Sequence, residues 1–330
     1  MSGPLYRDTT ANVPCPLTGS RGAVVIAERD RHGKPLRTVM SKASGLAFTD
    51  PRPTPDEVRR FYAEEYRVQY KQTATPKPKH IVRAGRLAQR RLSVFANRLA
   101  PGCRLLDAGA GGGEFVHLAT RRGFAAQGVE PNRGYAEFAI REYGVPVFNG
   151  FYQDAPFQPE QFDCVTMFHV LEHLEQPVDA LRLLAGWLRP GGTMVVEVPS
   201  LVATDTAPNQ KWHLGHLYHF TEATLAATAV LAGLRPVRFV EFGNVFGVFE
   251  KPAAGEPAGD AGACLRGAFE ANLRVLKSHT PLAHYSVPAR PLLRVWSKAS
   301  RAVSERRVTE RYRDRRPAEM LNDLALGRVA

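Results

Sequence analysis

Apolar residues in the middle of the chain gather in short runs, and stretches with helical spacing separate these runs. Five runs predict strands, at residues 104–108, 126–130, 146–149, 163–168 and 193–198. Strands that alternate with helices predict a mostly parallel sheet that is covered on both faces. Two later runs, at 237–242 and 245–250, flank Gly243 and Asn244 and predict an antiparallel hairpin that closes the sheet.

The flanks of this central pattern differ from it. Residues 1–75 carry turn signals between short runs such as 23–27, followed by a helix that begins near Thr54 and Asp56. A Pro- and Lys-rich linker follows at 75–79, and a Gly-, Pro- and Ala-rich connection lies at 252–262. Beyond it, apolar residues recur at helical spacing in a basic segment, at Leu292, Trp296, Ala299 and Val303. The predicted divisions are therefore 1–75, 76–251 and 252–330.

Composition narrows the class of protein. Of the 330 residues 44% are hydrophobic and 23% charged, which is ordinary for a globular protein, and no apolar stretch approaches the roughly 18 residues of a membrane span. The first residues lack the pattern of a secretory signal, so we expect a cytoplasmic location. The net charge of +12 favours anionic partners such as nucleic acid, phosphorylated carriers or acidic lipid. The four cysteines form no close pair, which argues against a disulfide framework.

A glycine-rich turn at residues 109–113 follows the first central strand and precedes a helix. Glycines accept positive φ and have no Cβ, so a ligand can approach the backbone, and the N–H groups at the helix start face it. Glu130 follows by about the 20 residues at which a carboxylate meets ribose hydroxyls in nucleotide-binding folds. A nicotinamide dinucleotide is disfavoured, because its G-x-G-x-x-G pattern requires glycine where this chain has Glu114.

The order Asp107-x-Gly109-x-Gly111-x-Gly113 resembles motif I of class I S-adenosylmethionine-dependent methyltransferases. Residues 128–132, 162–173 and 188–192 resemble the later motifs of that family, in the same order and at matching spacing. The resemblance implies an α/β fold: a Rossmann-like, doubly wound, seven-stranded methyltransferase sheet with a small N-terminal ribbon-like segment and a helical C-terminal extension. It also implies S-adenosyl-L-methionine as the cofactor.

The same resemblance assigns a cofactor site. Asp107 and the glycines would surround the methionine part, and Glu130 would accept hydrogen bonds from both ribose hydroxyls. An aromatic residue after the third strand would lie near the adenine, although it could equally belong to the core. The implied site residues are Asp107, Gly109, Ala110, Gly111, Gly113, Glu130, Pro131, Phe151 and His169.

The segment His169-Val170-Leu171-Glu172-His173 matches the H-x-x-E-H pattern of inverted zinc peptidases. Its place at the end of a strand within the methyltransferase pattern disfavours that interpretation. Some methyltransferases of this fold use a comparable set of acidic and histidine side chains to hold a divalent cation, and this alternative stays open. Because the place of His169 is also explained by the cofactor methionine, we expect no metal here.

Three histidines, His213, His216 and His219, recur at spacing three in a loop that commonly forms the acceptor wall in this fold. A neutral imidazole can remove a proton from a hydroxyl group near neutral pH, as O-methyl transfer requires. The candidate catalytic residues are therefore His216, His219 and His173. Equally, the loop histidines could hydrogen-bond loop backbone or cap the helix that begins near Thr221.

The N-terminal section resembles a bacterial methyltransferase subfamily in which a zinc ribbon with two C-x-x-C pairs precedes a ubiquinone-biosynthesis-methyltransferase-like core. The ligand positions here are Cys15, Thr18, Ser41 and Ser44. With one thiolate of four, a tetrahedral zinc site is not available, so we expect no structural zinc. By the same resemblance the next helix would bring aromatic residues towards the cofactor, although as an apolar stripe they could simply pack: Phe61, Tyr62, Tyr66 and Tyr70.

Together these features predict a methyltransferase that acts on a small-molecule, saccharide or carrier-linked acceptor, most simply by O-methylation. RNA methylation is the first alternative, motivated by the basic charge. A non-catalytic protein with the methyltransferase fold is the second. The C-terminal arginines could contact an anionic surface, or could lie on a solvated helix that packs on the core through Leu292, Trp296, Ala299 and Val303.

Overall fold

A computed structural model describes residues 5–54, 76–241, 243–286 and 289–328, with backbone alone for 289–298 and 301. The helix expected from Asp56, with its aromatic residues at 61, 62, 66 and 70, lies outside the described residues. So do Phe242 and the side chains of Leu292 and Trp296.

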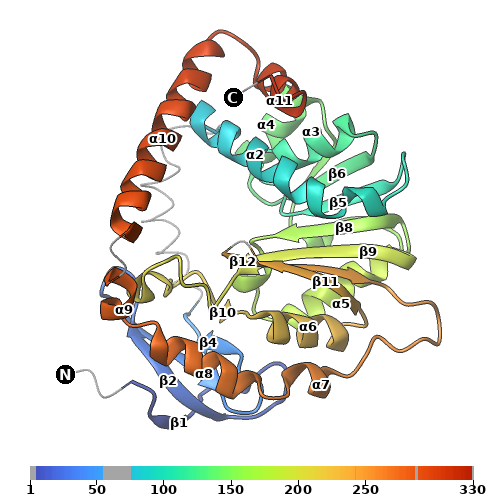
Figure 1. The fold of residues 1–330 in the computed structure, drawn as a ribbon. Coiled ribbons are helices and arrows are strands. Elements are labelled where there is room, and N and C mark those ends of the chain that lie inside the picture. Colours follow the sequence, from blue (N-terminus) through green and yellow to red (C-terminus); the bar gives the residue numbers. More distant parts are fainter. Residues whose placement is uncertain (1–4, 55–75, 242, 287–288, 329–330) are drawn as a thin grey trace. The chain divides into compact units, whose positions relative to one another are not determined.

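A seven-stranded sheet has the strand order β11-β12-β9-β8-β5-β6-β7 (Figure 1). β5 pairs in parallel with both β6 and β8, β6 pairs in parallel with β7, and β11 and β12 form an antiparallel hairpin. The expected Rossmann-like sheet of seven strands and its closing hairpin are therefore confirmed. The strands span, in sheet order, Arg235–Glu241 (β11), Asn244–Glu250 (β12), Leu188–Pro199 (β9), Phe162–Phe168 (β8), Arg104–Ala108 (β5), Ala125–Glu130 (β6) and Val147–Asn149 (β7).

The fifth central strand is longer than its sequence pattern indicated. β9 begins at Leu188 rather than at Thr193, so it includes the two glycines that were expected to form a preceding turn. Gly191 keeps a left-handed φ of +71°, which only glycine adopts without strain. The glycine pattern therefore identified a local change of backbone direction that lies within the strand.

The chain divides into two compact units. One comprises Met1–Gln69, Phe168–Gly186 and Met194–Val287, and the other comprises Tyr70–Met167, Trp187–Thr193 and Pro288–Ala330. The domain boundaries expected near residues 75 and 251 stay a prediction.

The first unit holds a second, five-stranded sheet with the order β1-β2-β3-β4-β10. Strand β2 and the helix α8 bury a shared apolar cluster that includes Ile26, Met40 and Leu276. At Gly45, with φ +70°, a Cβ would lie 2.8 Å from the carbonyl carbon of Ala268 at the start of α8, so a larger residue would displace the helix. These elements span Asp8–Thr10 (β1), Gly22–Arg29 (β2), Pro35–Ser41 (β3), Ala47–Thr49 (β4), Tyr218–His219 (β10) and Ala268–Ser278 (α8).

The second unit packs its C-terminal helices on α2 and α3. Leu321 of α11 is fully buried, and a Cβ on Gly85 of α2 would lie 2.5 Å from its Cδ2. The Asn322 amide oxygen lies 2.9 Å from Nε2 of His117 in α3. Helices of this unit span Pro78–Phe95 (α2), Glu114–Arg121 (α3), Arg133–Phe138 (α4), Ala289–Arg311 (α10) and Pro317–Ala325 (α11).

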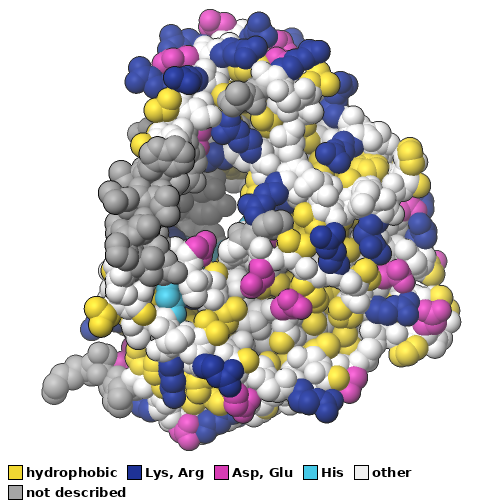
Figure 2. All heavy atoms as spheres, viewed as in Figure 1, with side chains coloured by type: hydrophobic (Ala, Val, Ile, Leu, Met, Phe, Trp, Pro, Cys, Tyr) yellow, Lys and Arg dark blue, Asp and Glu magenta, His cyan; other side chains and the backbone are white. Residues whose placement is uncertain are grey.

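The apolar stripe predicted along the basic helix is wrong in its described part. Val303 is 51% exposed, whereas Glu305 and Val308 of α10 are buried. Glu305 accepts a hydrogen bond of 2.7 Å from Nη2 of Arg83, so an ion pair to α2 fixes the face that packs. Lys and Arg side chains gather on the surface over α10 and α11 (Figure 2).

The remaining helices connect the elements above. Thr221 caps α6 through a capping box with Thr224, which confirms the expected helix start. These remaining helices span Pro177–Trp187 (α5), Glu222–Leu231 (α6), Ala261–Leu265 (α7) and Pro281–Tyr285 (α9). Short turns of 3₁₀ or π helix lie at Ala96–Arg98 (η1), Ala139–Tyr143 (η2), Tyr152–Asp154 (η3), Leu171–His173 (η4) and Pro208–Gln210 (η5). Among the described residues, no helix combines the length and apolar character needed to cross a membrane.

The packing of α11 generates a stability prediction. Replacing Leu321 by Ala removes a fully buried side chain and leaves a cavity, so we expect a loss of about 2–5 kcal/mol in the free energy of unfolding. Leu326→Ala is the matched control: Leu326 is 57% exposed, and its replacement should cost less than about 0.5 kcal/mol. Urea denaturation of the full chain measures both. Equal stabilities of the two variants would contradict the packing described above.

Candidate active site

The glycine-rich turn connects β5 to α3 and has the backbone that its sequence predicted. Gly109, Gly111 and Gly113 have φ values of +94°, +54° and +85°. At Gly113, the N-cap of α3, a Cβ would lie 2.5 Å from the Cβ of Ala139, so helix packing requires glycine. At Gly111 a Cβ would meet no atom within 4 Å. The turn is therefore tightly packed at its end and open at its centre.

The Glu130 carboxylate at the end of β6 is held by two backbone groups. The Gly111 N–H donates to Oε2 and the Asn132 N–H donates to Oε1, each at 2.8 Å. Burial raises the pKa of Glu130, and these two hydrogen bonds oppose the rise. The carboxylate is thus fixed in orientation and joined directly to the glycine turn. Each oxygen retains acceptor capacity for a further hydroxyl donor.

Asp107, the last polar residue of β5, is 2% exposed. Its Oδ1 accepts a hydrogen bond of 2.6 Å from Oγ1 of Thr166, its register partner on β8. Burial raises the pKa of Asp107 to about 6, although the Thr166 hydroxyl opposes the shift. Sequence reasoning missed Thr166, because only the register of two strands that lie 59 residues apart brings these side chains together.

The other cofactor-site candidates in the second unit occupy surrounding backbone. The N–H groups of Gly109 and Ala110 both donate to the Val129 carbonyl at 2.9 Å, which ties the turn to β6. The Pro131 carbonyl accepts a hydrogen bond from the Asn149 side chain. Phe151 is 62% exposed, so its ring is open to stacking and is not a core residue. Whether Phe151 contacts adenine stays a prediction.

His169 lies between two buried carboxylates of the first unit. Its Nδ1 is 3.4 Å from Oε1 of Glu172 and its Nε2 is 3.6 Å from Oε1 of Glu197. Burial alone would lower the pKa of His169, but the two carboxylates outweigh it and raise the pKa to about 9. The Asn244 amide donates to Glu197 Oε1 at 2.7 Å. The ring is therefore an imidazolium at neutral pH, held on a backbone with φ +54°.

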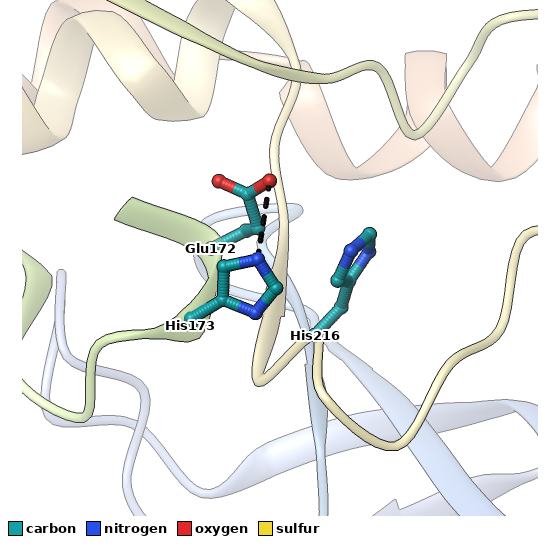
Figure 3. Close-up of side chains that lie close together, drawn as sticks. All are labelled: Glu172, His173 and His216. Atoms are coloured by element: carbon teal, nitrogen blue, oxygen red, sulfur yellow. Dashed lines mark ion pairs between the residues drawn. The ribbon is translucent and has the colours of Figure 1, made fainter. Parts of the chain in front are cut away.

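Three side chains lie close enough to share a metal ion, namely Glu172, His173 and His216 (Figure 3). One donor atom from each lies within 4.8 Å of those of the other two. Glu172 is 1% exposed, and its Oε1 lies 3.7 Å from Nε2 of His173. Nδ1 of His173 donates to the Gly215 carbonyl at 2.6 Å, which leaves Nε2 as the unprotonated nitrogen of the neutral ring. This set can act in proton transfer, and its donors also suit a divalent cation.

The loop histidines are neutral. Burial, with nearby positive groups, lowers the pKa of His213 to about 4 and of His219 to about 3, and it lowers the pKa of His216 well below its usual range. The ring of His216 lies 5.0 Å from that of His173. His219 is 4% exposed and its ring lies 5.1 Å from that of Trp212. The structure thus brings His173 and His216 together and buries His219.

Residues 79–238 match the model of a protein family described as a methyltransferase domain. Residues 79–238 therefore form a methyltransferase domain. The glycine turn, Glu130 and the candidate histidines all lie within the matched residues. This confirms the family resemblance that the motifs carried.

Curated relatives of this methyltransferase domain include a ubiquinone biosynthesis O-methyltransferase of Aeromonas salmonicida, 35% identical over 104 residues, which are 29% of this chain and 42% of the relative. A tRNA U34 carboxymethyltransferase of Azotobacter vinelandii is 30% identical over 130 residues, 35% of this chain and 41% of the relative. The chain thus spans less than half the length of these relatives. A solved Burkholderia thailandensis 1,6-didemethyltoxoflavin-N1-methyltransferase with bound S-adenosylhomocysteine aligns with a TM-score of 0.49 at 17% identity, covering 63% of this chain and 96% of that one.

The predicted zinc-ligand positions precede the methyltransferase domain. Cys15 and Ser44 are buried, and Sγ of Cys15 lies 3.1 Å from Oγ of Ser44. The N–H of Thr18 donates to the Cys15 carbonyl, and the Ser41 carbonyl accepts a hydrogen bond from the Gly45 N–H. A thiol–hydroxyl contact therefore joins two of the four positions. The likeness to a zinc ribbon, and the absence of zinc, stay predictions.

The carboxylates around His169 generate a pH prediction. We expect His169 to keep its proton up to about pH 9, and Glu197→Gln to move its pKa towards the ordinary 6.5 or so. Because the folded pKa is the higher one, the stabilisation from this charge is complete below about pH 6.5 and is lost as pH rises through about 9. NMR titration of labelled histidine measures the pKa directly.

Glu250→Gln is the control for this titration, since Glu250 pairs with Arg235 away from the histidine. It should leave the His169 pKa unchanged. A pKa near 6.5 in the unsubstituted chain would contradict the charged state assigned to His169.

Proposed function

We propose that this protein transfers a methyl group from S-adenosyl-L-methionine to a hydroxyl oxygen of a small-molecule, saccharide or carrier-linked acceptor. One observation carries the methyl-transfer part: within a matched methyltransferase domain, the glycine turn is hydrogen-bonded through Gly111 to the Glu130 carboxylate. A ribose-binding carboxylate fixed beside an open glycine backbone suits a nucleoside cofactor.

The cofactor, when bound, supplies an electrophilic methyl group on a sulfonium. In the proposed site Glu130 accepts from the ribose hydroxyls, Gly111 leaves room for close approach, and Phe151 offers a face for adenine. The family assignment adds Asp107, Gly109, Ala110, Gly113, Pro131 and His169. These residues bind and orient, and alignment of acceptor oxygen and methyl group is the main catalytic contribution of such a site.

A hydroxyl acceptor must lose its proton as the oxygen attacks, and His173 is the favoured base. Its Nδ1 proton is committed to the Gly215 carbonyl, so Nε2 takes the proton. Glu172, 3.7 Å from that nitrogen, stabilises the imidazolium that forms. His216 and His219 remain candidates from the sequence, but their lowered pKa values make them weak bases, so we assign them to shaping the loop around His173.

Proton transfer by this cluster requires no metal. The Glu172 carboxylate already has a cationic neighbour, because His169 is protonated at neutral pH and lies 3.4 Å from it. Compensation of a buried carboxylate by a cation is what such a site needs in order to remain ionised. We therefore propose that, of the residues in Figure 3, His173 acts as the base and Glu172 as its charged neighbour, and that this group is not a cation site.

The nature of the acceptor rests on the relatives. The Aeromonas relative is an O-methyltransferase of ubiquinone biosynthesis, which supports oxygen of a small molecule. RNA is the second candidate acceptor, favoured by the tRNA-modifying Azotobacter relative and by the net charge of +12. We also propose a cytoplasmic location, with contact to anionic surfaces through exposed arginines of the C-terminal helices, among them Arg306, Arg307 and Arg313.

Cofactor binding tests the first part of the proposal. Glu130→Ala removes the proposed acceptor of the ribose hydroxyls, and a hydrogen bond to a charged group is worth about 1.5–3 kcal/mol, so S-adenosylmethionine should bind about 10- to 100-fold more weakly. Calorimetry on the full chain measures the dissociation constant. Glu137→Ala, which removes an exposed carboxylate of α4, is the control and should bind normally. A folded native chain that binds no cofactor would instead indicate a non-catalytic protein.

The acceptor is tested with S-adenosylmethionine labelled in its methyl group, offered with phenols, nucleotide sugars or total RNA. We expect label in a hydroxyl-bearing small molecule, retained in EDTA. His173→Gln should then lower kcat about 100-fold or more with little change in cofactor affinity, since one general base contributes about 10²–10⁴. His213→Gln, in the loop between η5 and β10, is the control. Label found only in RNA would overturn the proposal, and loss of activity in EDTA restored by a divalent cation would assign Glu172, His173 and His216 to a metal instead.

A further inference from the structure

A cavity lies within the first compact unit, and its lining includes none of the residues of the glycine turn or of the His169 cluster. It has a volume of about 550 Å³, within the usual range for a site that encloses a small molecule. Three segments line it: the end of β2 with its following turn, the C-terminal end of α8, and the loop at 208–212. The Arg31 N–H donates to the Trp212 carbonyl at 2.9 Å, so two of these walls are hydrogen-bonded together.

The floor of this cavity is apolar. Ile26, Trp212 and Leu276 line it and also belong to the unit's buried apolar cluster, so the core itself is open to the cavity. An apolar cavity of this size gains little from water, which finds few polar partners there, whereas an apolar group that enters removes this surface from water. The floor therefore selects an apolar ring or a short chain.

The rim is basic. Cations line it from each wall: Arg29 from β2, Lys277 from α8 and Lys211 from the loop. Arg29 donates to the Gly33 carbonyl at 2.8 Å, Lys211 donates to the Leu201 carbonyl at 2.7 Å, and Lys277 lies 5.6 Å above the ring of Tyr6. These contacts of Arg29 and Lys277 are to neutral groups and leave their positive charges available, whereas Asp205 partly offsets the charge of Lys211. Burial also lowers the pKa of Lys211 to about 8.

The two acidic residues of the lining are occupied elsewhere. Glu28 pairs with Arg7 at 2.6 Å. Asp30 accepts hydrogen bonds from the backbone N–H groups of His32 and Lys34, at 2.9 and 2.8 Å, within its own turn. Arg7 therefore compensates Glu28, and four cations of the lining (Arg29, Arg31, Lys211 and Lys277) outnumber its two carboxylates, so the cavity has a net positive charge beside an apolar floor.

We propose that this cavity binds a small amphipathic anion, namely an apolar ring or short chain that carries a sulfonate, carboxylate or phosphate group. The apolar part lies on Ile26, Trp212 and Leu276, and the anionic group meets the cations of the rim. The cavity shares no lining residue with the proposed cofactor site, and this proposal does not depend on methyl transfer. Trp212 directly precedes His213, so an occupant contacts the loop that carries the candidate histidines.

Two dyes that share their rings test this site on the full chain: 8-anilinonaphthalene-1-sulfonate, an anion, and N-phenyl-1-naphthylamine, which lacks the sulfonate. We expect one molecule of the anion per folded chain and binding of the uncharged dye weaker by about fivefold or more, the scale of one partly exposed charge contact. Because Trp212 lines the cavity, excitation of tryptophan should produce dye emission by energy transfer.

Variants locate the bound dye. Lys277→Glu should weaken binding of the anion about fivefold and leave the uncharged dye unaffected. Arg274→Glu is the matched control, because Arg274 is exposed on the same helix and does not line the cavity. Trp212→Phe should abolish most of the energy transfer, whereas Trp187→Phe should not.

The proposal is overturned if both dyes bind equally, if Lys277→Glu and Arg274→Glu behave alike, or if the energy transfer survives Trp212→Phe. Binding that appears only as the chain loses its near-ultraviolet circular dichroism would also overturn it. Lys277 and Arg274 are both exposed, so neither charge variant removes core packing.

Discussion

The hydrogen bond from the Gly111 N–H to the Glu130 carboxylate makes the glycine turn and the end of β6 one structural unit. Parallel pairing of β5 with β6 brings the two segments to the same edge of the sheet, and the N–H groups of Gly109 and Ala110 then bond to Val129. This close approach leaves no room for a side chain at Gly128, where a Cβ would lie 2.6 Å from that of Ala110. The residues that suit a nucleoside cofactor are therefore the ones on which the local fold depends.

The histidines of the first unit show how environment sets charge. His169 lies between the carboxylates of Glu172 and Glu197 and is held as an imidazolium, whereas His216 and His219, buried near other positive groups, are neutral. Identical side chains within 50 or so residues of sequence thus take opposite charge states, since two carboxylates outweigh desolvation at His169, whereas desolvation dominates at His216 and His219. His173 differs again, because the Gly215 carbonyl fixes its tautomer.

Local signals predicted the elements that carry the cofactor site. Strand β5 begins and ends where its apolar run does, and the glycines at 109, 111 and 113 all adopt the positive φ that their spacing required. Partners that arise from tertiary register could not be predicted: Thr166 meets Asp107 only because β8 lies beside β5, and Asn244 reaches Glu197 only once the closing hairpin has formed. The predicted packing face of α10 was wrong for the same reason. The ion pair between Arg83 and Glu305, and not the spacing of apolar residues, determines which face of the helix packs.

The N-terminal sheet obtains part of its apolar core from a helix far along the chain. A segment of fewer than about 70 residues rarely buries enough apolar surface to fold alone and commonly relies on metal or disulfides, and three of its four predicted zinc-ligand positions lack cysteine. Helix α8, more than 200 residues later, supplies apolar surface through Leu276 and a hydrogen bond from Asn272 to the Gly45 carbonyl. Because α8 is needed to complete this core, its C-terminal end must lie beside β2, and that placement creates the cavity with the basic rim. The same packing that stabilises the sheet therefore forms the second site.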